Sequence, residues 1–557
     1  MRSAIVPIAV ALVASLLLAA GPWGSPVLTS SSGASSSSSA SVVAATTSVP
    51  APSVPPTTQV SLVPAQSAKV VVNPVSSGTA LPWSFWGLNV ESTQPFLSSD
   101  ASAIGATPVS FVRFPGGALG EMLNYTSGII TNLNGSQLHA QTSVQQFVAT
   151  CKLFHCQAIL QLPAEIDSPS TAAYYASYVV NTLHFQPAYW EIGNSPSGWT
   201  HFGTPWKNWG TVGGGNITPI PFAKLVLTYI TAIKLVDPAG KFLALGSGMG
   251  PKFYDRSWVE ELALIDGAVL TGISIHSYIM GGGPPNPTWS ELFANLTGEY
   301  SLINQVTADR QYIKDVCPVV CANLRIFVTE DNAAELSTYD SLLTSFAGPL
   351  YLAAETVQGL SLRVTNLDWF CYACQFPGAW TQTKGHWQMQ YYLFDDVLVH
   401  LENETLVTSV TGPTTFYAEA TTNSSGLSML MVNVNTTSAT LVNMTQSRFS
   451  IGTKAIEVLW KNGVGLPTEQ SVTISKTMRL PTHSIMLLTV GASGVKASGI
   501  SRESRAPASH APAPVVSTAS PSALLASLLS TPATPLQAPA IGGTLAAEKG
   551  RARPYPG

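Results

Sequence analysis

Polar and charged side chains close several short apolar runs in this 557-residue chain, and their types could exchange protons or bind hydroxyl groups. Glu330 ends the run IFVTE, and His276 and Tyr278 end the run ISIHSY. The candidates at the other run ends, or shortly after them, are Asn89, Arg113, Glu165, Asp167, Asn194, Ser195, Trp199, His201, Asp368 and Trp369. These residues can form one site only if the fold brings the run ends together.

The apolar runs have the length and the β-branched content of buried strands. They lie near residues 84, 109, 158, 188, 242, 273, 326 and 362, which makes eight. Between them, stretches such as TAAYYASYVVNTL repeat apolar residues at helical spacing. This alternation predicts an α/β fold with a (β/α)8 barrel over residues 81–400.

The pattern changes after residue 400. Runs such as LSMLMVNVN and HSIMLLTV are separated by Asn, Thr and Gly turns, which predicts a β-sandwich over residues 401–495. A strand within 67–80 is expected to join this sandwich. The Ser- and Pro-rich stretch 25–66 predicts a linker, and the Ala-, Pro- and Ser-rich stretch 496–557 predicts a disordered tail.

The first 24 residues have the pattern of a secretory signal peptide, with Arg2, an apolar stretch and then small residues. The protein is therefore expected outside the cell or on its surface. No later 18-residue apolar run could cross a membrane, so no insertion is expected beyond the signal. Only 10% of the residues are charged, the formal net charge is -4, and no Lys/Arg cluster predicts a nucleic-acid partner.

The six cysteines fall in three close pairs. In an oxidising compartment the pairs favour disulfides, whereas a single CxxC with no partner ligands at zinc spacing argues against a metal site. Eight N-x-S/T sequons add weight to an extracellular location. The expected pairs are Cys151 with Cys156, Cys317 with Cys321, and Cys371 with Cys374.

In a (β/α)8 barrel the carboxyl ends of the strands form one mouth, so the residues that close the runs are expected to converge there. Carboxylates, a His–Tyr pair and aromatic rings suit a sugar, whose C–H faces stack on rings and whose hydroxyls need hydrogen-bond partners. The expected partner is therefore a polysaccharide or another glycan.

Several of these segments resemble the motifs of clan A retaining glycoside hydrolases. YWEIGNSPSGW (189–199) is similar to their strand-four W-E-x-G-N-E-P signature, and IFVTEDN (326–332) to their strand-seven nucleophile segment. FVRFPGG and SIHSY resemble the strand-two and strand-six segments of the clan, and QYYLFDDVL resembles the final barrel helix of heparanase-like proteins. Together the segments resemble the heparanase and β-glucuronidase group, family 79. The similarity covers roughly residues 68–492.

The resemblance implies a double displacement with no cofactor, in which Glu330 attacks the anomeric carbon and a second carboxyl protonates the leaving oxygen. His276 and Tyr278 would orient Glu330, and Asn194 would bind the adjacent substrate hydroxyl. Arg113 would hold the nucleophile or a substrate carboxylate, as in a hexuronide, or form a structural ion pair. Asn89, Asp167, Trp199, His201, Asp368 and Trp369 are the other expected substrate contacts.

The chain departs from this pattern at the acid/base, because Ser195 stands where the clan has Glu and a hydroxyl cannot serve as the general acid. Glu191 lies about 13 Å deeper along the strand and is expected to be a buried structural carboxylate. In one hypothesis the acid has moved to Glu165, Asp167 or His201, although Glu165 could equally precede a helix capped by Ser168 or Ser170.

Two other hypotheses account for Ser195. The enzyme could cleave only glycosides with good leaving groups, or use a group of the substrate as the acid. Alternatively, the barrel could be a degenerate hydrolase that binds glycans, or an inert structural spacer at the cell surface. The low charge content suits an acidic habitat, because less charge repulsion accumulates as carboxylates are protonated.

Overall fold

The computed structural model describes residues 64–73, 79–80, 85–131, 135–198, 217–247, 255–280, 287–334, 340–373, 388–401, 404–422 and 426–491. The expected signal peptide, most of the linker and the tail lie outside these ranges, as do Trp199, His201 and Cys374.

Eight parallel strands close into a barrel, which confirms the predicted fold class. The strands follow one another around the barrel in chain order, and the last, β12, pairs with the first, β3. Each strand coincides with one of the eight apolar runs. They are β3 (Trp86–Asn89), β4 (Phe111–Phe114), β7 (Gln157–Leu162), β8 (Tyr189–Ile192), β9 (Phe242–Ser247), β10 (Gly272–Tyr278), β11 (Arg325–Asn332) and β12 (Leu367–Trp369).

Alternate residues of the strands fill the barrel in layers. The lower layer is a separate apolar cluster of Phe111, Ile159, Tyr189, Leu243 and Phe327. Two residues further along three of these strands, the side chains are polar: Arg113, Glu191 and Thr329, which contact one another. The barrel therefore changes from apolar to polar toward the carboxyl ends of its strands.

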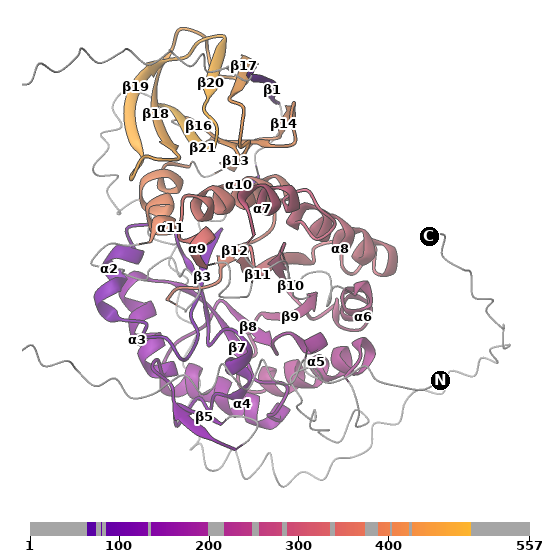
Figure 1. Ribbon diagram of the computed structural model, residues 1–557. Coiled ribbons are helices and arrows are strands. Elements are labelled where there is room, and N and C mark those ends of the chain that lie inside the picture. Colours follow the sequence, from indigo (N-terminus) through magenta and orange to yellow (C-terminus); the bar gives the residue numbers. More distant parts are fainter. Residues whose placement is uncertain are drawn as a thin grey trace, which may run out of the picture. The chain divides into compact units, whose positions relative to one another are not determined.

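Helices surround the strands (Figure 1). Their apolar positions recur at three- and four-residue spacing, as in α5, where Phe222, Val226, Tyr229 and Ile233 are buried. No described helix is both long and apolar enough to cross a membrane. The helices are α2 (Ala101–Ile104), α3 (Val144–Phe154), α4 (Pro169–Ser177), α5 (Pro219–Lys234), α6 (Arg256–Asp266), α7 (Trp289–Asn295), α8 (Leu302–Val316), α9 (Asp340–Leu343), α10 (Ala347–Leu362) and α11 (Met389–Tyr392).

Side-chain caps fix where several helices begin. Ser168 accepts a hydrogen bond from the backbone N–H of Thr171 and so caps α4, as the sequence predicted. A reciprocal capping box of Ser143 and Gln146 begins α3. These caps set the start of the two helices that flank β7.

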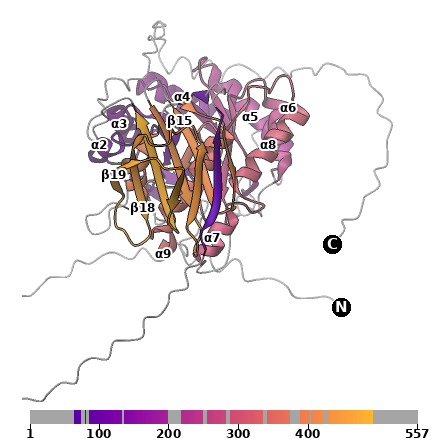
Figure 2. The ribbon, with the colours of Figure 1, turned by 90° about the horizontal axis from the view of Figure 1, so that it is seen from above.

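Two further sheets form the predicted β-sandwich, in which the indigo strand β1 runs among orange and yellow strands (Figure 2). Strand β1 pairs antiparallel with β14 and parallel with β17. One sheet has the order β14 (Thr408–Thr411), β1 (Gln66–Val72), β17 (Thr440–Gln446), β20 (Thr477–Leu480). The other has the order β19 (Thr468–Thr473), β18 (Lys454–Lys461), β21 (Ser484–Gly491), β16 (Gly426–Asn433), β15 (Phe416–Thr422), β13 (Glu404–Thr405), β2 (Thr79–Ala80). A small separate hairpin pairs β5 (Ile129–Thr131) with β6 (Gln137–His139).

The barrel and the sandwich share a hydrophobic core. Trp460 of β18 packs edge-on against Phe346 at the start of α10, with ring centroids 5.1 Å apart. The Ser361 hydroxyl at the other end of α10 donates to the Glu419 carboxylate of β15. The sandwich thus supports the helix that packs behind strands β11 and β12.

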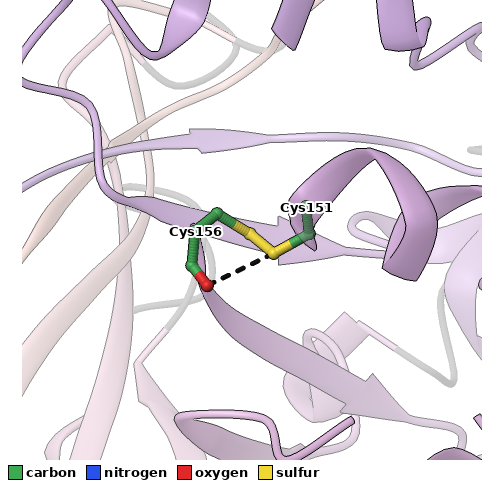
Figure 3. Close-up of a disulfide and its surroundings, with 2 residues drawn as sticks. All are labelled: Cys151 and Cys156. Carbon is green, nitrogen blue, oxygen red and sulfur yellow. Dashed lines mark hydrogen bonds between the residues drawn. A yellow bond between two sulfur atoms is a disulfide. The ribbon is translucent and has the colours of Figure 1, made fainter. Parts of the chain in front are cut away.

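Two of the expected disulfides form. Cys151, near the end of α3, bonds to Cys156, just before β7, where its Sγ also lies 3.3 Å from the carbonyl oxygen of Cys156 (Figure 3). Cys317 bonds to Cys321 after α8. Because the paired cysteines are only five and four residues apart, each bond constrains a local turn between a helix and the next strand. The third expected pair includes Cys374, outside the described residues.

Candidate active site

Glu330 lies at the carboxyl end of β11 and faces the polar side of the barrel. The pairing of β10 with β11 shifts register between Ile275 and His276, as at a β-bulge. As a result, both Thr329 and Glu330 contact residues inside the barrel, whereas simple alternation would turn one of them outward. The register shift therefore aims the Glu330 carboxylate at the mouth.

Two side chains donate hydrogen bonds to the Glu330 carboxylate, and a third lies close to it. Arg113 Nη1 donates to Oε1 over 2.7 Å, and the Tyr278 hydroxyl donates to Oε2 over 2.6 Å. His276 Nδ1 lies 3.3 Å from Oε2. Burial leaves the pKa of Glu330 above its ordinary value, and Arg113 and the Tyr278 hydroxyl limit that rise. These contacts favour the ionised form of a carboxylate that is only 3% exposed.

His276 is neutral in this setting. Burial and the nearby Arg113 charge hold the pKa of its imidazole well below the usual range. Because Glu330 can only accept, the Nδ1 atom facing it is assigned the proton. His276 and Tyr278 therefore both lie beside the Glu330 carboxylate.

Arg113 connects the barrel floor to the mouth. Its Nε donates to Glu191 over 2.5 Å, and its Nη2 donates to Asn194 Oδ1 over 2.8 Å. The side chain is completely buried, and nearby Glu191 and Glu330 keep the pKa of its guanidinium above the ordinary value. Since every nitrogen of the guanidinium already has a protein acceptor, Arg113 holds the candidate nucleophile and Glu191 together.

Ser195 and Asn194 follow β8 and lie in the same site. The Ser195 hydroxyl is 3.5 Å from His276 Nδ1 and 3.4 Å from Asn194 Nδ2. Ser195 has a positive φ of 45°, which few residues other than glycine adopt. The position therefore belongs to the site, but it carries no carboxyl that could donate a proton.

A second buried carboxyl, Glu121, lies beneath the ends of β7 and β8. It belongs to the short 3-10 helix η2 (Ala118–Met122), and it accepts hydrogen bonds from the backbone N–H groups of Ala164 and Glu165 at 2.7 and 2.9 Å. Burial raises its pKa to about 8, although these two hydrogen bonds and a third from the backbone of Asn194 lower it. Glu121 follows no apolar strand run, so no strand-end signal marked it.

The two carboxyls proposed as a relocated acid are differently placed. Glu165 is 4% exposed, and its backbone is held by Glu121. Asp167 interacts with the Tyr175 hydroxyl of α4, and its carbonyl accepts from Tyr229 of α5. Asp167 is therefore tied to the helical layer outside the strands.

Three predicted substrate contacts are fully buried in the structure. Trp369 is fully buried and packs on Tyr351 of α10, with ring centroids 6.1 Å apart. Asp368 is buried against Gly87 and has a raised pKa because of that burial. Asn89 donates to the carbonyl of Thr329 and accepts from Arg113. Alternation along β12 turns Trp369 away from the barrel interior, and Asn89 joins the support of the site rather than its surface.

One carboxyl that the sequence did not single out, Glu91, lies two residues beyond β3. Its Oε2 accepts from Gln94 Nε2 over 2.7 Å, and the side chain is only partly buried. A Cβ atom built on Gly117, after β4, would lie 2.8 Å from Glu91 Oε1. Burial and the Glu330 charge raise the pKa of Glu91 to about 7. Its place two residues past Asn89, at the end of the first strand, was a signal that could have found it.

Trp199 and His201, the other expected contacts, lie outside the described residues. Within the described ranges, no group of three His, Cys, Asp or Glu side chains is placed to hold a metal ion.

The barrel with its sandwich, and the polar residues at the carboxyl ends of its strands, place the chain in a class of folds shared by several solved structures. A family 51 arabinofuranosidase from Xanthomonas axonopodis pv. citri has a TM-score of 0.64 at 15% identity, covering 76% of this chain and 99% of that one. An α-L-arabinofuranosidase from Thermotoga maritima has a TM-score of 0.61 at 15% identity, covering 76% and 100%.

A family 44 xyloglucanase from Paenibacillus polymyxa has a TM-score of 0.56 at 10% identity, covering 76% of this chain and 100% of that one. Identities this low establish a common fold and nothing finer. A scan against protein-family models and a search of curated proteins found no match.

Proposed function

We propose that this protein is a retaining glycoside hydrolase with Glu330 as its nucleophile. The observation that carries the proposal is the set of side chains around the Glu330 carboxylate: Arg113 and Tyr278 donate to it over 2.7 and 2.6 Å, and His276 lies 3.3 Å away. A buried carboxylate held by two hydrogen bonds beside an imidazole, at the carboxyl end of a barrel strand, is fixed in position for attack.

In the proposed reaction Glu330 attacks the anomeric carbon and forms a covalent glycosyl ester, which water then hydrolyses with the same anomeric configuration restored. Tyr278 and Arg113 keep the carboxylate ionised and oriented. Asn194 accepts a hydrogen bond from Arg113 through its Oδ1, which fixes the side chain. Its Nδ2 would donate to a substrate hydroxyl. No cofactor takes part in this scheme.

The proposed substrate is a glycan whose reacting sugar need not carry a charge. Arg113 is completely buried and four of its five N–H groups donate to Glu191, Glu330, Asn194 and Asn89, so it is poorly placed to bind a hexuronide carboxylate. The structural neighbours named above are an arabinofuranosidase pair and a xyloglucanase, which supports a glycosidase in general. Membership of the heparanase-like family 79 remains a prediction.

Ser195 favours a second candidate function, a degenerate hydrolase that binds glycans without cleaving them. Its hydroxyl lies in the site beside His276 but cannot protonate a leaving alcohol. In that case the barrel would bind a glycan reversibly and the wild type would show no turnover. Neutralising Glu330 would then change only the affinity for the glycan.

Turnover on a panel of aryl glycosides and polysaccharides at pH 3–7 tests the proposal. The reporters are released phenol, reducing ends, and the first anomer seen by proton NMR. We expect wild type to release the retained anomer, and Glu330→Gln to lose turnover by roughly 10³-fold or more. Glycan binding with no turnover by wild type would favour the degenerate hydrolase.

We also propose that the protein works outside the cell. The signal-like first 24 residues and the two disulfides support this location. Expression of the full chain with a C-terminal tag should yield extracellular protein that lacks the signal segment by mass, whereas retention of Met1 inside the cell would contradict it.

A further inference from the structure

A retaining hydrolase needs a second carboxyl that cycles between protonated and ionised forms, and Ser195 cannot provide it. This inference rests on the proposed function and asks which carboxyl among the described residues could take that role. It must lie near Glu330, remain partly accessible, and hold its proton while Glu330 stays ionised.

Three carboxyls fail these conditions by their contacts. Glu191 is completely buried in its ion pair with Arg113. Glu121 is occupied by backbone N–H groups of Ala164 and Glu165. Asp167 interacts with Tyr175 in the helical layer. Glu165 remains as a rival because it lies past β7, although it is 4% exposed.

Glu91 meets the conditions. It lies two residues past Asn89 at the carboxyl end of β3, and the Asn89 side chain bonds both Arg113 and the carbonyl of Thr329, next to Glu330. The charges of Glu330 and Arg113 accordingly act on the Glu91 carboxyl. Gln94 holds Oε2 at 2.7 Å, while Oε1 lies against the Cα of Gly117, with no side chain between them. The carboxyl is therefore held at the mouth and is more accessible than Glu330, Glu165 or Glu191.

The contacts of the two carboxyls also decide which one carries the proton. Within the described residues, Glu330 accepts from the Arg113 cation and from the Tyr278 hydroxyl, whereas Glu91 accepts from the neutral Gln94. A proton shared between two nearby carboxyls goes to the one with fewer donors. Burial and the Glu330 charge accordingly raise the pKa of Glu91 to about 7, so it is protonated in acid and ionised above neutrality.

From this arrangement we infer that Glu91 is the catalytic acid/base that replaces the carboxyl missing at Ser195. In the first step Glu330 bonds to the anomeric carbon, the bond to the glycosidic oxygen breaks, and the Glu91 proton passes to that oxygen, releasing an alcohol. In the second step ionised Glu91 takes a proton from water. The water oxygen bonds to the anomeric carbon, and the ester to Glu330 breaks.

The test compares Glu91→Gln with wild type, in the full chain, on aryl glycosides whose leaving phenols differ in acidity. For a poor leaving group such as phenol itself, kcat/KM should fall by roughly 10²- to 10⁴-fold. For 2,4-dinitrophenol, which leaves without a proton, the first step should hardly change. Added azide, which needs no deprotonation, should restore turnover of this substrate and give the retained glycosyl azide. The basic limb of the pH profile should also disappear.

Glu165→Gln is the matched control, because it makes the same change in the rival carboxyl. It should give no glycosyl azide. Glu91→Asp, which keeps a carboxyl, guards against a folding defect in Glu91→Gln and should retain the basic limb. Equal loss for all leaving groups without azide rescue would overturn the inference, as would a glycosyl azide formed by Glu165→Gln. If wild type turned over no glycoside and formed no adduct, the proposed function would fail first.

Discussion

A carboxylate that attacks carbon must stay ionised even when water is nearly excluded from it. Glu330 is 3% exposed, and burial alone raises its pKa. The hydroxyl of Tyr278 opposes this shift from 2.6 Å. A hydrogen bond to a charged group is worth about 1.5–3 kcal/mol, so removing it should move the Glu330 pKa by about one to two units.

We therefore expect Tyr278→Phe to shift the acidic limb of the kcat/KM profile to higher pH, since the nucleophile would then ionise later. At acidic pH the variant should lose about tenfold or more in rate. Tyr351→Phe is the matched control, because that hydroxyl donates to the neighbouring Asp331 at 3.1 Å and not to Glu330. An unchanged acidic limb in Tyr278→Phe would show that its hydrogen bond does not govern the nucleophile.

For single residues, the sequence predicts which side chains lie near the site better than it predicts the direction in which each one points. Glu330 was predicted from motif resemblance, whereas its inward direction depends on a register shift between β10 and β11 that no local pattern encodes. Trp369 was expected at the mouth, but strand alternation directs it against α10. Glu91 lies two residues beyond a strand end, and that place in the chain, not apolar periodicity, was the signal that could have found it.

At the scale of elements, Glu121 joins three parts of the barrel. Its carboxylate, carried by η2 after β4, holds backbone N–H groups at the ends of β7 and β8. These strand ends carry Glu165, Asn194 and Ser195. Losing the carboxylate would leave those N–H groups buried without an acceptor, at about 1–3 kcal/mol for each unsatisfied group.

Glu121→Ala should accordingly lower the free energy of unfolding by about 3 kcal/mol or more, measured by urea denaturation. Glu260→Ala is the control, because this residue forms a partly exposed ion pair with Arg256 at 3.4 Å, worth at most about 1 kcal/mol. Equal effects of the two substitutions would mean that Glu121 does not hold the strand ends.

The elements were the part of the fold most open to prediction. All eight apolar runs form barrel strands because buried parallel strands are apolar on both faces. The pairing of β1 with β14 and β17 joins segments more than 300 residues apart, and a single strand pattern cannot specify its neighbours.

At the scale of the whole molecule, several buried carboxyls of the described residues form no ion pair. Burial raises the pKa of Asp266 and of Asp331 to about 8, and that of Glu419 to about 7, from ordinary values of 3.8 and 4.5. A raised pKa means that the folded state binds more protons than the unfolded state between those limits. The resulting stability is fully present below about pH 4 and is lost as pH rises to about 8.

We therefore expect the melting temperature to fall by several degrees between pH 5 and pH 8.5, measured by differential scanning calorimetry. Asp266→Asn, which removes one such titration, should flatten the decline. A melting temperature that rises over this range would contradict the raised pKa values of these carboxyls. The low charge content, 10% of residues, points in the same direction, toward a protein suited to acid.

The central claim, that Glu330 is a working nucleophile, is tested most directly by trapping. The full chain would be incubated at pH 3–7 with activated 2-fluoro glycosides of several sugars, followed by intact mass and peptide mapping. We expect one glycosyl adduct on the peptide that contains Glu330, and none in Glu330→Gln. An adduct on another carboxyl, or no adduct with any sugar alongside measurable glycan binding, would contradict it.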